Sequence, residues 1–260
     1  MESSSLGSWR RTRRNALAAG GLLAGAMLSQ LGASKANAGH GNGNGHGNGR
    51  GGGACFLRGT RLLTPSGERK VEELRIGGLV TTLRGEAKPI TWIGRRVCRL
   101  SIGSKHPDGV LPVRVAKRAL GPDAPHCDLF ISQQHALWID GLFIKAMDLV
   151  NGSSITVHST AEHSEIEYLH VKIAQHDVIF AEGAPSETLL VHSGNVERFD
   201  NFAEYLRLFG EDAADEMCFA PIAFGNGRER LMSRLRSAVS PWLDCRNEFD
   251  KARDRIAELE

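Results

Sequence analysis

Cys55-Phe56-Leu57-Arg58-Gly59-Thr60 opens the part of the chain that decides the fold. The preceding residues 39–53 are almost entirely Gly, Asn and His, a composition that buries little surface and is typical of a flexible linker. Cys55 therefore lies where a linker meets a folded body, which can hold the peptide bond between Ala54 and Cys55 while the upstream chain stays loose. A cysteine in that position is a candidate nucleophile for the carbonyl group of the residue before it.

Short apolar runs follow from Cys55 to about Val191, and Gly, Pro, Asp and Ser separate them. Each run has the length of a strand, several are β-branched, and turn signals recur at short intervals. Examples are residues 61–64, 79–82, 90–93, 113–115, 129–131 and 178–180. We expect an all-β domain over residues 55–191.

After Gly194 the spacing of apolar residues changes to that of amphipathic helices. Three groups each lie on one helical face: Phe199, Phe202, Leu206 and Phe209; Leu231, Leu235, Val239 and Trp242; and Phe249, Ala252, Ile256 and Leu259. We expect a short α-helical C-terminal extension over residues 192–260, which packs against the β-domain or against another chain.

Residues 1–38 have the pattern of an export signal. A basic stretch at 10–14 precedes a weakly apolar run at 16–31, and Ala36-Asn37-Ala38 supplies the small-x-small pattern of a signal peptidase site. Residues 12–17 resemble a twin-arginine signal. We expect the twin-arginine or general export machinery to deliver the protein to the periplasm or the medium, with no stable membrane anchor after signal removal.

The net charge is only +2, and much of that excess comes from the basic stretch near the N-terminus, so composition gives no reason to expect nucleic acid as a partner. The five cysteines, Cys55, Cys98, Cys127, Cys218 and Cys245, include no Cys-x-x-Cys pair. This spacing argues against a zinc knuckle and a dense disulfide framework, and we expect no metal site. An odd number of cysteines leaves at least one thiol free or paired between molecules.

His135 is the best candidate for protonating the nitrogen of the Ala54–Cys55 peptide, because an imidazole with its usual pKa of ~6.5 can act as acid or base near neutral pH. It ends the segment Ser132-Gln133-Gln134-His135, in which the Ser132 hydroxyl can bond the backbone or the scissile amide. His170 and His176 are spaced to lie on one face of a strand. A structural and a catalytic role stay open for both, and we take His176 as an assisting residue.

Four blocks in this order resemble the Hedgehog/intein (Hint) domains of bacterial proteins. Cys-Phe-x-x-Gly-Thr at 55–60 is similar to their first block, residues 71–77 to the turn and strand that follow, Ser132-x-x-His135 to their Thr-x-x-His block, and residues 168–183 to a late block. The resemblance implies a horseshoe-shaped all-β fold, no cofactor, and an N–S acyl shift at Ala54–Cys55 that converts the amide into a thioester.

Under this resemblance Cys55 is the nucleophile, His135 the general acid for the scissile nitrogen and Ser132 its local support. The substrate is the chain's own N-terminal segment, so each molecule reacts once. Two departures from the family pattern matter. Gly78 replaces the usual Asp, which we expect to loosen one turn, and no late asparagine follows a histidine as it does at the end of an intein.

We therefore expect self-cleavage without splicing, although the segment to be released after the export signal is only residues 39–54. Two alternatives stay open. One is a secreted binding or structural domain that keeps the Hint fold without the chemistry. The other is a hydrolase that uses a Cys–His dyad on other molecules.

Overall fold

The computed structural model describes residues 53–100, 109–159, 165–192, 194–210, 218–223, 232–233, 235–238, 240 and 244–259. The expected export signal, residues 1–38, and nearly all of the expected linker, residues 39–54, lie outside the described residues. No helix within the described ranges is long and apolar enough to cross a membrane.

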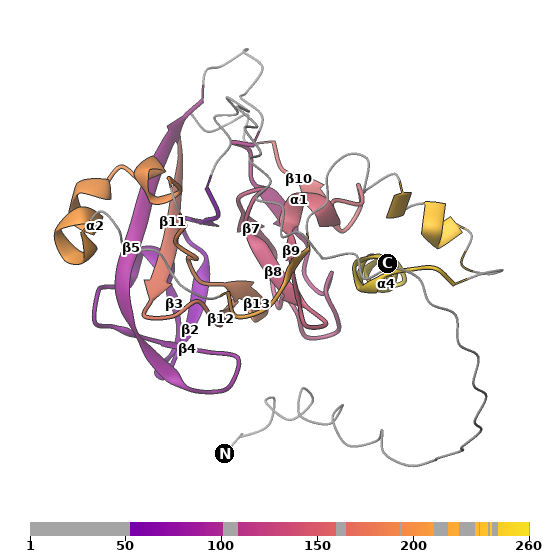
Figure 1. Ribbon diagram of the computed structural model, residues 1–260, viewed down its shortest axis with the longest axis horizontal. Coiled ribbons are helices and arrows are strands. Elements are labelled where there is room, and N and C mark those ends of the chain that lie inside the picture. Colours follow the sequence, from indigo (N-terminus) through magenta and orange to yellow (C-terminus); the bar gives the residue numbers. More distant parts are fainter. Residues whose placement is uncertain are drawn as a thin grey trace, which may run out of the picture. The chain divides into compact units, whose positions relative to one another are not determined.

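Two seven-stranded sheets form the framework of the described part of the chain (Figure 1). Neighbouring strands are antiparallel except for one parallel pair, β14 and β9. The first sheet runs in the order β10 (Ile155–Val157), β6 (Val113–Val115), β7 (Leu129–Ile131), β1 (Phe56–Leu57), β11 (Glu165–Ile173), β5 (Ala87–Arg99) and β4 (Leu79–Thr81). The second runs in the order β14 (Ile222–Ala223), β9 (Leu142–Lys145), β8 (Ala136–Ile139), β13 (Ala184–Glu187), β12 (Val178–Ala181), β2 (Arg61–Thr64) and β3 (Gly67–Lys70). The predicted all-β domain is confirmed, and each of the six quoted apolar runs forms or contributes to a strand.

The two-residue strand β1 lies at the centre of the first sheet. Phe56 pairs with Leu169 of β11 on one side and with Ile131 of β7 on the other. The long pair of β11 with β5 continues the sheet beyond it. Because β1 begins directly after Cys55, this pairing carries the expected nucleophile into the middle of the sheet.

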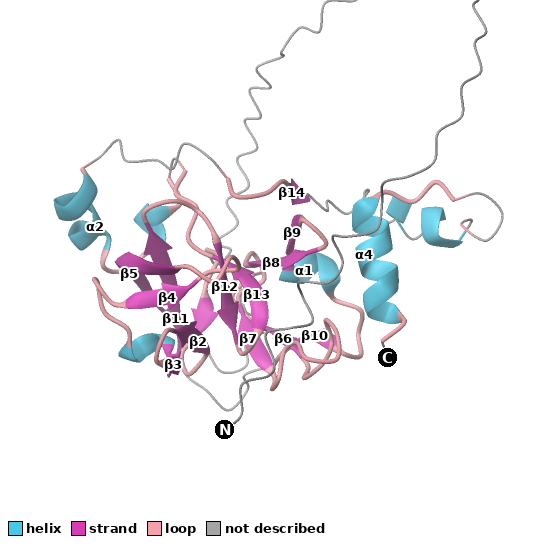
Figure 2. Cartoon of the chain, turned by 90° about the horizontal axis from the view of Figure 1, so that it is seen from below, coloured by secondary structure: helices cyan, strands magenta, loops and turns pink. Residues whose placement is uncertain are grey.

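The C-terminal helices pack against the β-domain. In α2 (Phe202–Phe209) the Tyr205 ring lies 5.0 Å from that of Trp92, and Phe199, just before the helix, lies 5.3 Å from Trp92. In α4 (Glu248–Ala257) the buried face, Phe249, Ala252 and Ile256, joins the main hydrophobic core. Figure 2 shows the strands between these two helices.

Two of the three expected C-terminal helices are thus confirmed. Asn247 and Asp250 form a capping box that starts α4. Of the second expected helix, residues 231–242, only 232–233, 235–238 and 240 are described, and the first two stretches are helical. Three further short helices are α1 (Ala146–Leu149), which follows β9, and the 3-10 helices η1 (Val71–Glu73) and η2 (Val196–Arg198).

The turn at Gly78 is well bonded, contrary to the loosened turn that we expected. The Gly78 amide donates to Arg75 O at 2.9 Å, and Gly78 O accepts from the Ile90 amide at 2.8 Å. A Cβ atom at Gly78 would lie 2.9 Å from Arg75 O. A side chain in place of Gly78 would therefore crowd the backbone of the turn.

The backbone of Gly94 in β5 lies against the Phe199 ring, because a Cβ atom at Gly94 would be only 2.6 Å from that ring. We predict that Gly94→Ala lowers the free energy of unfolding by about 1–3 kcal/mol, since the added methyl group must displace a packed ring. Phe199→Ala alone is expected to cost about 3–5 kcal/mol. Denaturant unfolding of the double variant should show a smaller loss than the sum, and strictly additive losses would contradict this contact.

Candidate functional site

The Ala54–Cys55 peptide is held at the start of β1. Cys55 is buried, and its carbonyl accepts a hydrogen bond from the Ser132 amide at 2.9 Å. Its thiol takes part in no disulfide. The nucleophile that the sequence predicts is therefore a free, buried cysteine with its own backbone fixed in the sheet.

The Ser132 hydroxyl bonds the two residues on either side of Ala54, Gly53 and Cys55. Its oxygen accepts from the Cys55 amide at 2.8 Å and donates to Gly53 O at 2.7 Å. Ser132 follows directly on β7, the strand that pairs with β1. The hydroxyl thus contacts the scissile amide. The sequence had left two partners open for it, this amide or another part of the backbone.

His170 contacts the other polar group of the peptide. Its Nδ1 atom forms a short hydrogen bond with the carbonyl oxygen of Ala54, which requires the proton to be on Nδ1. Burial lowers the pKa of His170, while the Glu187 carboxylate and the contact with Ala54 oppose that shift. A neutral ring with its proton on Nδ1 places an N–H donor where negative charge would develop on this carbonyl.

His135 is buried beside His170 and Phe56, with ring centroids 4.9 and 4.3 Å away. Within the described residues neither ring nitrogen has a hydrogen-bond partner. Burial, and then the neighbouring His170 and His176, hold the pKa of His135 well below its usual value. The ring is therefore neutral at pH 7, whereas with its usual pKa a fraction of the molecules would carry a charged ring.

Among the described residues, the contacts of His176 are with residues other than Ala54 and Cys55. Strand β11 ends at Ile173, so His170 and His176 do not share the strand face that we expected. The His176 ring packs on Phe143, its Nδ1 accepts from the Phe219 amide at 3.1 Å, and its Nε2 lies 3.8 Å from Glu187 Oε2. Glu187 also accepts from the Ala136 amide at 2.7 Å, so any influence of His176 on the peptide passes through neighbouring groups.

His170 is the site residue that sequence reasoning did not select. It is the histidine that the pairing of β11 with β1 brings to Ala54, although 116 residues separate the two in sequence. A partial signal was present, because His170 lies between the apolar residues Leu169 and Val171, although Tyr168 and Lys172 in the same strand are also titratable and buried. An unexplained polar residue inside an apolar strand is a candidate for a function.

The Cys55 thiol has one basic neighbour that favours its ionised form. Burial raises the pKa of Cys55, and the positive charge of Arg96 is the main opposing influence. Arg96 lies on the same alternate-residue face of β5 as the buried Trp92 and Cys98. Its Nη1 atom is buried and has no hydrogen-bond partner among the residues that the structure describes.

A cleft of about 500 Å³ reaches the upstream side of the scissile peptide. Its lining combines backbone and small residues with basic, acidic and amide side chains: Gly53, Ala54, Gln134, Ala136, Lys145, Glu187, Leu189, Leu190, His192, Gly194, Asn195, Arg198 and Ile222. A small reagent can therefore approach Ala54 from solvent although Cys55 itself is buried.

Two solved structures illustrate the proteins to which this chain is similar. The solution structure of a bacterial intein-like domain from Clostridium thermocellum is 14% identical, covers 52% of this chain and 98% of its own, and superposes with a TM-score of 0.37. The crystal structure of the MchDnaB-1 intein (N145AA) is 13% identical, covers 51% and 99%, and has a TM-score of 0.35. No protein of curated function matches the sequence.

The sequence also matches the family model described as the Hint domain, and the match spans residues 54–193, more than half of the chain. It begins at Ala54, the residue whose carbonyl His170 contacts, and includes Ser132 and His135. This chain belongs to the Hint domain family.

Proposed function

We propose that this protein is a single-turnover autoprocessing domain that cleaves its own chain between Ala54 and Cys55 without splicing. Membership of the Hint family supports autoprocessing in general. The observation that carries the proposal is that side chains engage both polar groups of this one peptide. Ser132 bonds its N–H and His170 its carbonyl oxygen.

In the proposed reaction the Cys55 Sγ atom attacks the carbonyl carbon of Ala54. The developing oxyanion accepts a hydrogen bond from His170 Nδ1–H, which is a stronger bond to a charged than to a neutral oxygen. The C–N bond then breaks, and a thioester joins Ala54 to Sγ while Cys55 gains a free α-amino group. The thiol proton ends on this nitrogen, so the step needs no co-reactant.

His135 is the proposed carrier of that proton. Because the His135 ring is neutral and the pKa of Cys55 is raised, the resting pair is a thiol and an uncharged imidazole. His135 would first accept the proton as a base and then donate it to the leaving nitrogen as an acid. Its unpartnered ring nitrogens leave it available for both steps.

The second nucleophile would reach the thioester through the cleft at Ala54. Water would release residues 1–54 slowly as a carboxylic acid, and hydroxylamine would release them as a hydroxamate. The late asparagines follow Gly, Asp or Arg, whereas the asparagine at the end of an intein follows His. This difference supports a reaction that stops after cleavage, without ligation.

Hydroxylamine treatment of the purified full chain tests the proposal. We predict cleavage between Ala54 and Cys55, observed by intact mass spectrometry as a fragment that begins at Cys55. Cys55→Ala should abolish cleavage, while Cys98→Ala, which removes another buried thiol, should not. An uncleaved wild-type chain would favour the binding-domain alternative, and cleavage of an added peptide by the intact chain would favour a hydrolase acting in trans.

His170 and His176 should differ in their effect on this cleavage. We predict that His170→Ala lowers the rate by about 10²–10³-fold, because an oxyanion donor is lost. His176→Ala, which removes no described contact with the peptide, should lower it far less. Single-turnover rates with hydroxylamine measure both, and a greater loss in His176→Ala than in His170→Ala would contradict the proposed roles.

Removal of the Arg96 charge should slow thioester formation. Without it burial raises the pKa of Cys55 unopposed, so we predict a rate roughly tenfold lower in Arg96→Met. Arg95→Met is the matched control, because Arg95 is the adjacent residue of β5 and is exposed. Equal rates in the two variants at neutral pH would show that Arg96 does not act on the thiol.

We also propose that the export machinery recognises residues 1–38 and that the protein works outside the cytoplasm. The arginine-rich start and the Ala36-Asn37-Ala38 site support this. The protonated, buried thiol favours slow cleavage, which would leave the signal attached during transport. Cell fractionation with N-terminal sequencing tests it: the expected exported protein begins at Gly39 or Cys55, and a wholly cytoplasmic pool would contradict the proposal.

A further inference from the structure

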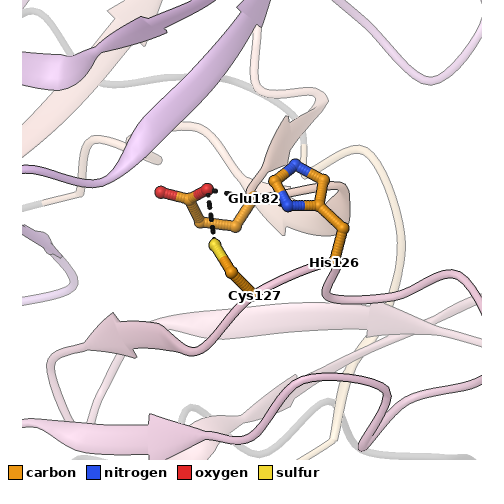
Figure 3. A group of neighbouring side chains, drawn as sticks. All are labelled: His126, Cys127 and Glu182. Carbon is orange, nitrogen blue, oxygen red and sulfur yellow. Dashed lines mark hydrogen bonds and ion pairs between the residues drawn. The ribbon is translucent and has the colours of Figure 1, made fainter.

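A second cluster of reactive side chains lies away from the scissile peptide. His126 and Cys127 precede β7, and Glu182 lies in the turn between β12 and β13. Figure 3 shows the three side chains directed toward one another. The Cys127 thiol donates to Glu182 Oε2 at 3.0 Å, and His126 Nδ1 lies 3.9 Å from the same oxygen.

The three ligand atoms, a sulfur, a nitrogen and an oxygen, all lie within 4.8 Å of one another. Ideal bonds of about 2.3 Å to sulfur and about 2.0–2.2 Å to nitrogen and oxygen place tetrahedral zinc ligands roughly 3.4–3.6 Å apart. The distances of 3.0 and 3.9 Å lie on either side of this range. Small side-chain rotations would therefore bring the cluster into coordination geometry.

Hydrogen bonds to residues outside the cluster orient the side chains of His126 and Glu182, so that one atom of each faces the cluster. His126 Nε2 lies 2.6 Å from Glu68 Oε1, so this nitrogen carries the proton and the Nδ1 lone pair faces the cluster. A carboxylate on the far ring nitrogen is the usual support of a metal-binding histidine. Glu182 Oε1 likewise accepts from the Arg61 amide at 2.8 Å, so Oε2 is the oxygen that faces the cluster, where it also lies 4.0 Å from Arg61 Nη1.

We propose that His126, Cys127 and Glu182 bind a transition-metal ion of the zinc class, with solvent as the fourth ligand. Binding would displace the thiol proton to solvent, and the ion would take the place of the Cys127–Glu182 hydrogen bond. His126 is exposed, which gives the ion and its solvent ligand access. The sequence did not suggest this site, because Glu182 lies 55 residues from Cys127 and no Cys-x-x-Cys pair is present.

A second cysteine–histidine contact is a weaker candidate. Cys218 Sγ lies 3.3 Å from His176 Nδ1, but that nitrogen already accepts a hydrogen bond from the Phe219 amide. Its lone pair is therefore engaged, unlike that of His126 Nδ1. This difference makes Cys218 the matched control for Cys127.

The proposed ion would fix the segment that supplies Ser132. Cys127 lies five residues before Ser132, and β7 joins them. The ion would tie this segment to the β12–β13 turn, in addition to the hydrogen bond from the His126 amide to Glu182 O at 2.9 Å. A ligand that binds only the folded chain stabilises it, so the melting temperature should rise with metal concentration.

Titration of the metal-free full chain with Co²⁺ tests this site, with Cys55→Ala as the background to exclude the catalytic thiol. We predict one equivalent bound, a thiolate-to-cobalt charge-transfer band in the near ultraviolet, and competition by Zn²⁺. Cys127→Ser should remove the band, whereas Cys218→Ser and Cys245→Ser should keep it. Glu68→Gln should weaken binding by about 10–100-fold, the usual effect of losing such a support.

Circular dichroism and melting temperatures without metal would establish that each variant is folded. Should Cys127→Ser fail to fold, the Glu68→Gln and His126→Ala affinities decide the question, because neither change removes a thiol. Absence of a thiolate band, a band that survives Cys127→Ser, or one that is lost in Cys218→Ser would overturn the proposal.

Discussion

The rest of the site depends on the two hydrogen bonds that the Ser132 hydroxyl makes. This one group accepts from the Cys55 amide and donates to Gly53 O, so it fixes the chain on both sides of Ala54. A two-residue strand alone would hold this junction weakly. Its position between β11 and β7 brings Ser132 from one side and His170 from the other to the same peptide.

The electrostatics of the site favour a neutral resting state. Burial disfavours both the thiolate of Cys55 and the charged form of His135. In the proposed reaction the Cys55 thiol and the His135 imidazole begin uncharged, so attack by sulfur would be coupled to transfer of its proton. Arg96 is the basic side chain that opposes the effect of burial on the thiol. Such a site suits the proposed reaction, which each molecule would perform once and need not perform quickly.

Much of the fold could be predicted because strand-length apolar runs and helical spacing are local properties of the sequence. The Cys55, Ser132 and His135 positions could also be found, since they fall in short ordered blocks. The choice between His170 and His176 could not, because it depends on where β11 ends and on its pairing with β1. The His126–Cys127–Glu182 cluster was hidden for the same reason, as the turn that carries Glu182 meets the chain before β7 only in the folded structure.

The most direct test of this account compares the rate of hydroxylamine cleavage in wild type, Ser132→Ala and Ser132→Thr. Small misplacements of reacting groups cost large factors in rate, so the account predicts a loss of about 10²-fold in Ser132→Ala. Ser132→Thr keeps the hydroxyl and should cleave at nearly the wild-type rate. Cleavage that proceeds equally fast in Ser132→Ala, with the domain folded, would contradict the central role of this hydroxyl.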